Sequence, residues 1–259
     1  MKIYIFSDME GISGISQSSH VEPGSVHYPL GCKLMEMDIN ACVAGCFKAG
    51  ADGVVVRDGH GGGVNVNPLE IDPRAELIQG NSGACRFPGI DDCDALILLG
   101  YHAMAGTPNA ILEHTFSSKT IQNMWLNEEL VGEFAIDALI AAEHNVPTIM
   151  VSGDDKICTE ASDLLPQVVC CQVKTALTSS GAKLLSPQKA QKLITDKTIE
   201  AIGKIGKIPL LPVLNSTCLK TEVVERGVLP SAPREDLAII DGRTYEVRRK
   251  TLEAAFFSK

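Results

Sequence analysis

The alternation of short apolar runs with longer amphipathic segments constrains the fold of this chain more than any other feature. Aliphatic and β-branched runs recur through the first two thirds of the sequence, at 3–6, 54–56, 95–99, 148–151 and 168–172. Segments with apolar residues at helical spacing, such as 34–47 and 134–143, separate some of these runs. This pattern predicts βαβ units, and therefore an α/β fold with a mostly parallel sheet flanked by helices.

The rhythm changes in two places. Alternating residues on both sides of a polar Asn127-Glu128-Glu129 turn predict a hairpin over 120–131. Ser186-Pro187 is typical of a helix start, here running to about residue 205, and is followed by shorter predicted strands at 210–214, 221–224 and 244–247 and a helix near 251–257. We therefore expect an α/β catalytic domain over 1–190 and a smaller C-terminal α+β domain over 191–259.

Composition excludes several classes of partner and function. No apolar stretch reaches the roughly 20 residues of a membrane-spanning helix, and the sequence starts without a cationic and apolar signal segment. The nine cysteines are odd in number and lack C-x-x-C spacing, which indicates reduced thiols and a cytoplasmic protein. A net charge of −9 without a basic run argues against nucleic acid as a partner.

Polar residues follow four of the predicted strands at the point where each strand ends. These strand exits read Ser7-Asp8-Met9-Glu10-Gly11, Asp58-Gly59-His60-Gly61, Gly100-Tyr101-His102 and Gly153-Asp154-Asp155. Ligands of open parallel sheets bind beyond the carboxyl ends of the strands. We therefore expect these carboxylates and imidazoles to meet at one edge of the sheet.

The residue types at this edge indicate a metal site. Asp8 and Glu10 are one residue apart in extended chain, so both side chains point to the same side. Carboxylate and imidazole ligands together suit zinc, manganese or iron better than magnesium or calcium. Asp154 and Asp155 are candidates to orient metal-bound imidazoles. For any single residue a structural role is the alternative, for example a loop cap for Asp8.

The absence of several well-known catalytic motifs weakens other interpretations of the site. The run His60-Gly61-Gly62-Gly63 resembles the oxyanion loop of some esterases, but the chain has no G-x-S-x-G nucleophile motif. It also has no G-x-G-x-x-G, P-loop or H-E-x-x-H motif. The glycines therefore indicate a backbone that passes close to a metal or substrate.

A set of ordered motifs resembles the zinc-dependent D-aminopeptidases associated with dipeptide-transport operons. The resemblance is dense over about residues 1–190 and thin beyond. It rests on Ser7-Asp8-Met9-Glu10-Gly11-Ile12-Ser13-Gly14, Asp58-Gly59-His60, Gly100-Tyr101-His102-Ala103, Val131-Gly132-Glu133, Val151-Ser152-Gly153-Asp154-Asp155, Val173-Lys174 and Leu185-Ser186-Pro187.

The resemblance implies a specific site and assembly. Two zinc ions would be held by Asp8, Glu10, His60, His102 and Glu133, with Asp8 bridging them. A histidine matching His114 would be the catalytic nucleophile or base. Glu133 and His114 lie outside the strand-exit pattern, so their roles come from the resemblance alone. It further implies release of N-terminal D-amino acids from short peptides by a ten-subunit, two-ring homo-oligomer.

Two departures from the family pattern stand out. The segment between His102 and Glu133 differs slightly in length, and Ser179-Ser180-Gly181 replaces a basic residue before the Leu-Ser-Pro motif. The sequence thus predicts a dinuclear zinc aminopeptidase acting on short peptides. Two alternatives remain at this point: another metal-dependent amide or phosphoester hydrolase on the same site, and a non-catalytic peptide-binding protein in which the metal only stabilises the fold.

Overall fold

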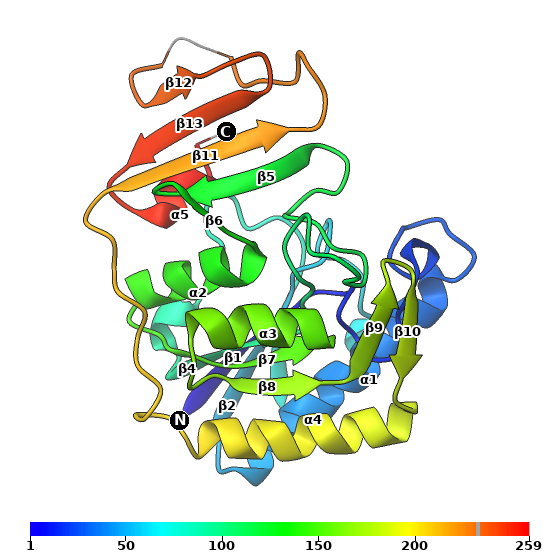
Figure 1. Cartoon of the computed structure of the whole chain (residues 1–259). Coiled ribbons are helices and arrows are strands. Elements are labelled where there is room, and N and C mark those ends of the chain that lie inside the picture. The colour runs from blue at the N-terminus through cyan, green and yellow to red at the C-terminus, as the bar shows by residue number, and fades with distance from the viewer. Residues whose placement is uncertain (232–233, 259) are drawn as a thin grey trace.

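Two β-sheets, one parallel and one antiparallel, organise the molecule (Figure 1). A computed structural model describes residues 1–231 and 234–258. The parallel sheet and its helices form the lower part of the view in Figure 1, and the antiparallel sheet lies above them. The predicted α/β architecture with a smaller α+β part is confirmed.

The six-stranded sheet is parallel throughout and carries the predicted strands. Its order is β3-β2-β1-β4-β7-β8, with bounds Ala75–Ile78, Gly53–Asp58, Lys2–Ser7, Ala95–Leu99, Thr148–Gly153 and Val169–Gln172. From β1 the chain adds β2 and β3 on one side, and from β4 it adds β7 and β8 on the other. The direction of winding therefore reverses between β1 and β4, which is where ligands of such sheets bind.

Helices cover both faces of this sheet, as parallel strands require crossover connections. Figure 1 shows α1 (Tyr28–Lys48) and α4 (Pro187–Ile202) side by side below the sheet. The helices α2 (Glu133–Glu143) and α3 (Asp155–Leu164) lie above it. Within the described ranges, no helix is long and apolar enough to cross a membrane.

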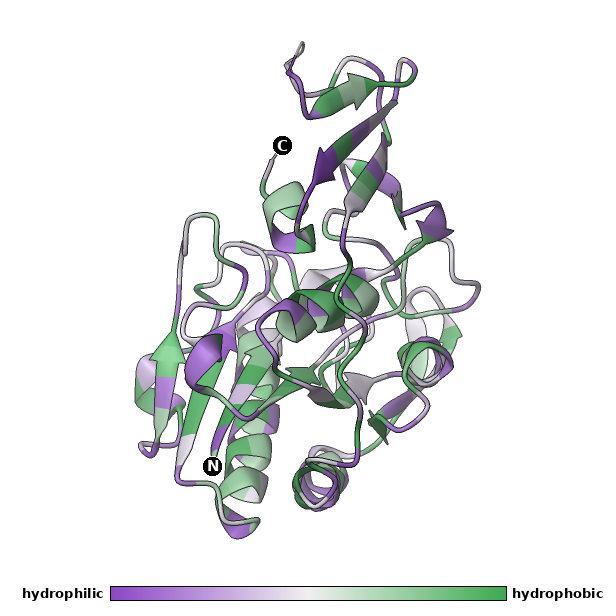
Figure 2. Cartoon of the chain, turned by 90° about the vertical axis from the view of Figure 1, so that its left-hand side faces the viewer, coloured by the Kyte–Doolittle hydropathy of each residue, from purple (hydrophilic) through white to green (hydrophobic). Residues whose placement is uncertain are grey.

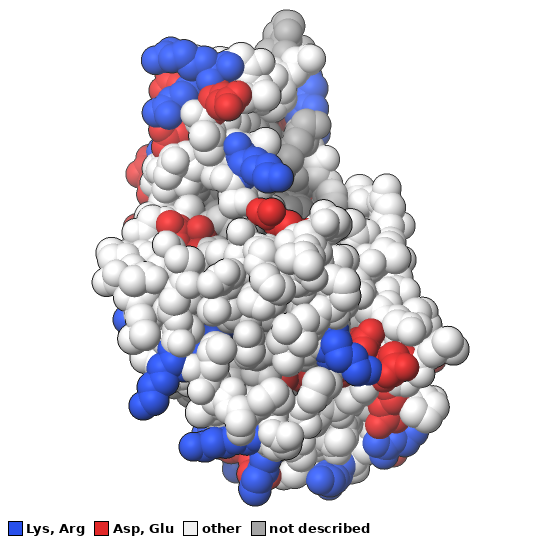
Figure 3. Space-filling model, turned by 90° about the vertical axis from the view of Figure 1, so that its right-hand side faces the viewer, with Lys and Arg blue, Asp and Glu red and all other residues white. Residues whose placement is uncertain are grey.

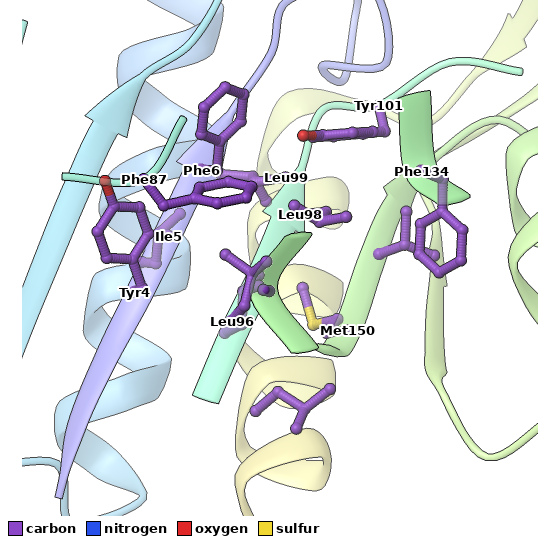
Figure 4. Packing of buried hydrophobic residues seen from close by; sticks show 14 of the residues in the cluster. Tyr4, Ile5, Phe6, Phe87, Leu96, Leu98, Leu99, Tyr101, Phe134 and Met150 are labelled. Atoms are coloured by element: carbon purple, nitrogen blue, oxygen red, sulfur yellow. The ribbon is translucent and has the colours of Figure 1, made fainter. Parts of the chain in front are cut away.

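The core is centred on β1 and β4, whose side chains are almost entirely buried. Figure 2 shows that the inner strands are mostly hydrophobic. In Figure 4, Tyr4, Phe6 and Phe87 gather beside β1, and Phe87 meets Phe6 edge to face with ring centroids 5.3 Å apart. Aromatic pairs of this geometry add to the free energy gained by burial. The strands that carry the site are thus anchored in the best-packed part of the molecule.

The antiparallel sheet combines the predicted hairpin with the C-terminal strands. Its order is β12-β13-β11-β5-β6, with bounds Leu237–Ile239, Thr244–Arg249, Thr217–Val223, Ile121–Leu126 and Glu129–Leu130. The helix α5 (Leu252–Phe256) packs between this sheet and α2. The expected hairpin over 120–131 is confirmed. The domain boundary at residue 190 stays a proposal. The strands β5 and β6 precede that boundary in the sequence but pair with the C-terminal strands in one sheet.

One predicted strand is wrong and one hairpin was not predicted. Residues 210–214 form no strand. Pro209 and Pro212 lack the N–H groups that a strand needs for pairing, so this apolar run becomes the connection between α4 and β11. The strands β9 (Lys174–Thr178) and β10 (Gly181–Leu184) form a hairpin around Ser179-Ser180.

Candidate metal centre

The exits of β1 and β4 are bonded to each other where the winding of the sheet reverses. The Asp8 N–H donates to the Leu99 carbonyl at 2.8 Å, and the Gly11 N–H donates to the Gly100 carbonyl at 2.7 Å. A Cβ at Gly11 would lie 1.9 Å from the Tyr101 carbonyl oxygen, so only glycine permits this approach. The loops that carry the acidic and imidazole side chains are therefore fixed against each other.

Asp8 lies between two imidazoles. Its Oδ1 is 3.1 Å from His60 Nδ1, and its Oδ2 is 3.4 Å from His102 Nε2. The aspartate is 7% exposed, so both oxygens are held inside the protein. One carboxylate thus presents a separate oxygen to each of two groups of possible metal ligands.

One further side chain completes the first group, and two complete the second. On one side, Glu10 Oε2 lies 3.2 Å from His60 Nδ1. On the other, Glu133 Oε1 lies 3.2 Å from His102 Nε2 and 3.7 Å from His114 Nε2. Within each triad, Asp8-Glu10-His60 and His102-His114-Glu133, the possible ligand atoms lie within 4.8 Å of one another. The structure therefore brings all six predicted site residues together.

Backbone carbonyls orient all three imidazoles. His60 Nε2 lies 2.9 Å from the Val21 carbonyl oxygen, His102 Nδ1 lies 3.0 Å from that of Ala103, and His114 Nδ1 lies 2.9 Å from that of Leu112. If each of these nitrogens carries its proton and donates, the opposite nitrogen, which faces the carboxylates, keeps a lone pair. This is the arrangement that metal-binding histidines use.

The expectation that Asp154 and Asp155 orient the imidazoles is wrong, because carbonyls perform that task. Asp154 caps α3 and also accepts a hydrogen bond from the Ile111 N–H at 2.9 Å. Asp155 accepts from the Ala176 N–H at 2.7 Å. Asp154 therefore acts on the segment that leads to His114, and not on a ring nitrogen.

The electrostatics of the site are those of an acidic cluster that attracts cations. Burial alone would raise the pKa of Asp8, but the His102 and His60 imidazoles outweigh it and hold that pKa well below its ordinary value. Burial lowers the pKa of His60, yet Glu10 and Asp8 raise it to about 12. The pKa of His102 is raised well above its ordinary value in the same way, mainly by Glu133 against burial. In the metal-free protein, protons on the imidazoles thus balance the carboxylates.

Two buried atoms show that the residues present fit metal ions. Glu10 Oε2 and His102 Nε2 are buried, and although each lies 3.2 Å from an oppositely charged group, neither contact has the geometry of a hydrogen bond. An unsatisfied buried polar atom costs about 1–3 kcal/mol, so each needs a partner. Both belong to the mixed carboxylate and imidazole set that suits zinc. A cation on each side of Asp8 would supply the missing partners.

The centre opens into a cavity of about 830 Å³. Asp8, Glu10, His60, His114 and Glu133 all line it, and His102 lies behind them. Ser179 and Ser180, from the turn between β9 and β10, also line the cavity. The Ser179-Ser180-Gly181 departure from the family pattern thus lies beside the metal centre and not on a distant surface.

Sequence reasoning missed the arginine in this cavity. Arg86 lines it and donates from Nε and Nη2 to the two oxygens of Asp137, each at 2.7 Å. Tyr101 also donates to Asp137, at 2.6 Å. The available signal was the single acidic residue inside the apolar helix 134–142, because a buried carboxylate needs a cationic or hydrogen-bonding partner.

Lys174 also received no role from the sequence. Its side chain is 2% exposed, and its Nζ donates to the carbonyls of Glu10, Ile12 and Ile15 at 2.5, 2.9 and 2.8 Å. These three bonds fix the loop behind Glu10. A lysine at the first position of a strand carries no sequence signal for such a contact.

Comparison with known proteins gives a consistent result. The D-aminopeptidase family model matches residues 1–256. A D-aminopeptidase of Bacillus subtilis (strain 168) is 36% identical over 215 residues, which cover 82% of this chain and 78% of that protein. The solved structure of the Zn-dependent D-aminopeptidase DppA from Bacillus subtilis, described as a self-compartmentalizing protease, matches with a TM-score of 0.92 at 31% identity. That match covers 99% of this chain and 94% of the other.

Proposed function

Because this chain belongs to the D-aminopeptidase family and is a zinc aminopeptidase, we propose that it uses two zinc ions to release N-terminal D-amino acids from short peptides. The observation that carries the proposal is the position of Asp8, with its two oxygens 3.1 Å from His60 and 3.4 Å from His102. A site for a single ion would need only one imidazole beside this carboxylate.

In this proposal Asp8 would contribute to both metal sites. Glu10 and His60 would complete one ligand set, and His102 and Glu133 would complete the other. When bound, zinc would lower the pKa of a water molecule and polarise the scissile carbonyl. The buried ligands and the carbonyl-bound imidazoles would hold this arrangement fixed, with little reorganisation during the reaction.

His114 is the proposed acid–base residue. Its Nε2 lies 3.7 Å from Glu133 Oε1, and the residue lines the cavity. From this position it would accept a proton and return it to the leaving amine. Its place in one triad also permits metal binding, and the metal content of a His114 variant separates the two roles.

The alternatives drawn from the sequence lose support. Membership of the D-aminopeptidase family supports an aminopeptidase over another metal-dependent amide or phosphoester hydrolase, and over a non-catalytic peptide-binding protein. The acidic side chains of the cavity, which include Glu22 and Glu113, would favour a substrate with a protonated α-amino group. This supports cleavage at a free N-terminus.

Self-association is a further part of the proposal. The solved relative is described as self-compartmentalizing, and we propose that this chain also forms a homo-oligomer, with ten subunits in two rings. Figure 3 shows a face whose broad middle part carries few charged side chains. Large apolar side chains are exposed as well, including Leu69 at 90% and Val26 at 84%. Light scattering would test this, since a 27.7 kDa monomer would contradict it.

We propose a cytoplasmic location because the cysteines form no disulfide bonds. All nine cysteines are free, as expected for a reducing compartment.

A panel of D- and L-alanyl peptides tests the activity. The zinc-loaded protein is expected to release alanine from the D-alanyl peptides, to lose this activity on chelation and to regain it with added zinc. Equal rates on D and L peptides would contradict the proposed stereochemistry. No cleavage of any peptide by the zinc-loaded protein would contradict the proposed function.

A further inference from the structure

A second cavity adjoins the metal centre and has the opposite charge. Its volume is about 350 Å³, and Gly59, Gly61 and Arg86 line both cavities. Two arginines, Arg57 and Arg86, line the second cavity, and in the described part of the chain no aspartate, glutamate or histidine does. In a protein of net charge −9, a cationic hollow beside an acidic centre calls for an explanation.

Arg57 is the unusual residue of this cavity. It is 8% exposed at the end of β2, and its Nη2 donates to the Gly80 carbonyl at 2.6 Å. Its Nε and Nη1 are buried without a hydrogen-bond partner. Burial lowers the pKa of Arg57, which reflects the cost of keeping its charge away from water. Buried arginines are normally paired with an anion.

The neighbouring aspartate does not supply that anion. Asp58 Oδ2 accepts hydrogen bonds from the N–H groups of Asn65 and Val66, at 2.6 and 3.1 Å. Its Oδ1 accepts from Asn65 Nδ2 at 2.6 Å, and Gln79 Nε2 donates to Oδ2 at 3.2 Å. No ion pair between Arg57 and an acidic residue occurs among the residues that the structure describes.

Arg86 forms the wall between the two cavities and is held rigidly. Asp137 binds its Nε and Nη2 edge, and its guanidinium carbon lies 4.3 Å from the centre of the Phe6 ring and 5.3 Å from that of Phe116. An arginine fixed through one edge keeps its charge in place without a change of rotamer. The guanidinium of Arg86 thus stands between the metal centre and Arg57.

Glycines keep the second cavity open. Gly61, Gly62, Gly63, Gly80 and Gly83 line it. A Cβ added at Gly62 would meet no atom within 4 Å, so this part of the wall borders open space. A side chain added at Gly62 would therefore meet no neighbouring atom.

From these observations we propose that the second cavity is a carboxylate subsite, which binds the C-terminal carboxylate of a short peptide whose N-terminal residue lies at the metal centre. Guanidinium groups bind carboxylates through paired charge-assisted hydrogen bonds. The inference rests on the proposed peptidase function and adds a reason for short substrates. A peptide that spans the two cavities would place its ammonium end at the acidic centre and its carboxylate end in the cavity lined by Arg57 and Arg86.

The test compares peptides that end in a free carboxylate with their C-terminal amides. D-alanyl di- and tripeptides are assayed in both forms with the zinc-loaded enzyme. For the length that reaches the subsite, kcat/KM is expected to be about 10- to 100-fold higher for the acid, the effect of a charge-assisted hydrogen bond. Equal kcat/KM values for acid and amide at both lengths would overturn the subsite while leaving the peptidase function intact. Absence of all peptidase activity would instead contradict the proposed function.

Two matched pairs of variants locate the preference. Gly62→Asp adds a negative charge to the cavity wall, and Gly62→Asn adds the same shape without the charge. The acid-to-amide ratio should fall toward 1 in Gly62→Asp and stay near the wild-type value in Gly62→Asn, with equal zinc content in both. Arg57→Gln should lower the ratio similarly, and Arg57→Lys should retain part of it. A wild-type ratio in both Gly62→Asp and Arg57→Gln would show that the carboxylate binds elsewhere.

Acetate distinguishes the peptide carboxylate from a free anion. If the cavity belongs to the substrate, acetate should compete with the acid peptide and inhibit hydrolysis of the amide less. Equal inhibition of acid and amide hydrolysis would make the cavity a site for an independent anion and would overturn the assignment.

Discussion

The imidazole of His114 stacks on that of His102, with ring centroids 4.0 Å apart and ring planes 11° apart. The stack leaves His102 Nε2 directed at Asp8 and Glu133, while His114 lies nearer the cavity. This contact places a third imidazole where substrate would bind.

His114→Ala tests whether this residue takes part in the chemical step. The variant should retain near-normal zinc, because five other ligands remain, and kcat should fall by roughly 10²- to 10⁴-fold. Zinc content and steady-state kinetics are measured on the same preparation. Loss of one zinc ion would identify His114 as a ligand, and a change confined to KM would limit it to substrate binding.

The bridging role of Asp8 predicts unequal effects of two isosteric changes. Asp8→Asn should release more zinc than Glu10→Gln, since Asp8 lies close to both His60 and His102, whereas Glu10 lies close only to His60. Metal content after dialysis against zinc-free buffer measures the difference. Equal loss in the two variants would argue against a bridge.

The raised pKa values of His60 and His102 predict that zinc must displace protons. Both rings are protonated at neutral pH in the metal-free protein, because their pKa values are raised, that of His60 to about 12. Zinc affinity should therefore rise with pH, by up to about 100-fold per unit if two protons leave. Calorimetry in buffers of different ionisation enthalpy counts the released protons, and a pH-independent affinity would contradict this account.

The same shift fixes the pH dependence of the metal-free fold. The pKa of His60 is raised on folding, so its contribution to stability is complete below the unfolded value of about 6.5 and disappears only as pH approaches about 12. Between these two values the contribution falls by about 1.4 kcal/mol per pH unit, so the metal-free protein should be less stable at pH 9 than at pH 7. A chelator titration followed by urea unfolding at these two pH values measures it.

Lys174→Met tests the support behind Glu10. Removing three hydrogen bonds to buried carbonyls should lower the free energy of unfolding by about 2–4 kcal/mol, and should weaken zinc binding on the Glu10 side. Lys156→Met is the control, because Lys156 forms a partly exposed ion pair with Asp155, and exposed ion pairs contribute little to stability. Equal destabilisation by both changes would show that the hydrogen bonds of Lys174 do not stabilise the loop behind Glu10.

The parts of the site that could be predicted from sequence follow directly from the strands. Asp8, Glu10, His60 and His102 come immediately after strands β1, β2 and β4, so a parallel sheet alone brings them together. His114 and Glu133 reach the site through an irregular segment and a helix start, whose paths no periodicity determines. Their prediction depended on family resemblance.

Long-range pairing explains what could not be predicted. Arg86 meets Asp137 across 51 residues, and Lys174 meets the Glu10 carbonyl across 164. Neither residue lies in a local pattern that indicates its partner. The strand expected at 210–214 does not form for a local reason, because Pro209 and Pro212 lack the N–H groups that strand pairing needs.

Zinc per chain, measured by elemental analysis alongside activity, tests the central claim most directly. The account predicts about two zinc ions per chain, loss of D-alanyl peptidase activity on chelation, and recovery as the second equivalent of zinc is restored. Full activity with one zinc ion per chain, or with none, would contradict the dinuclear centre built around Asp8.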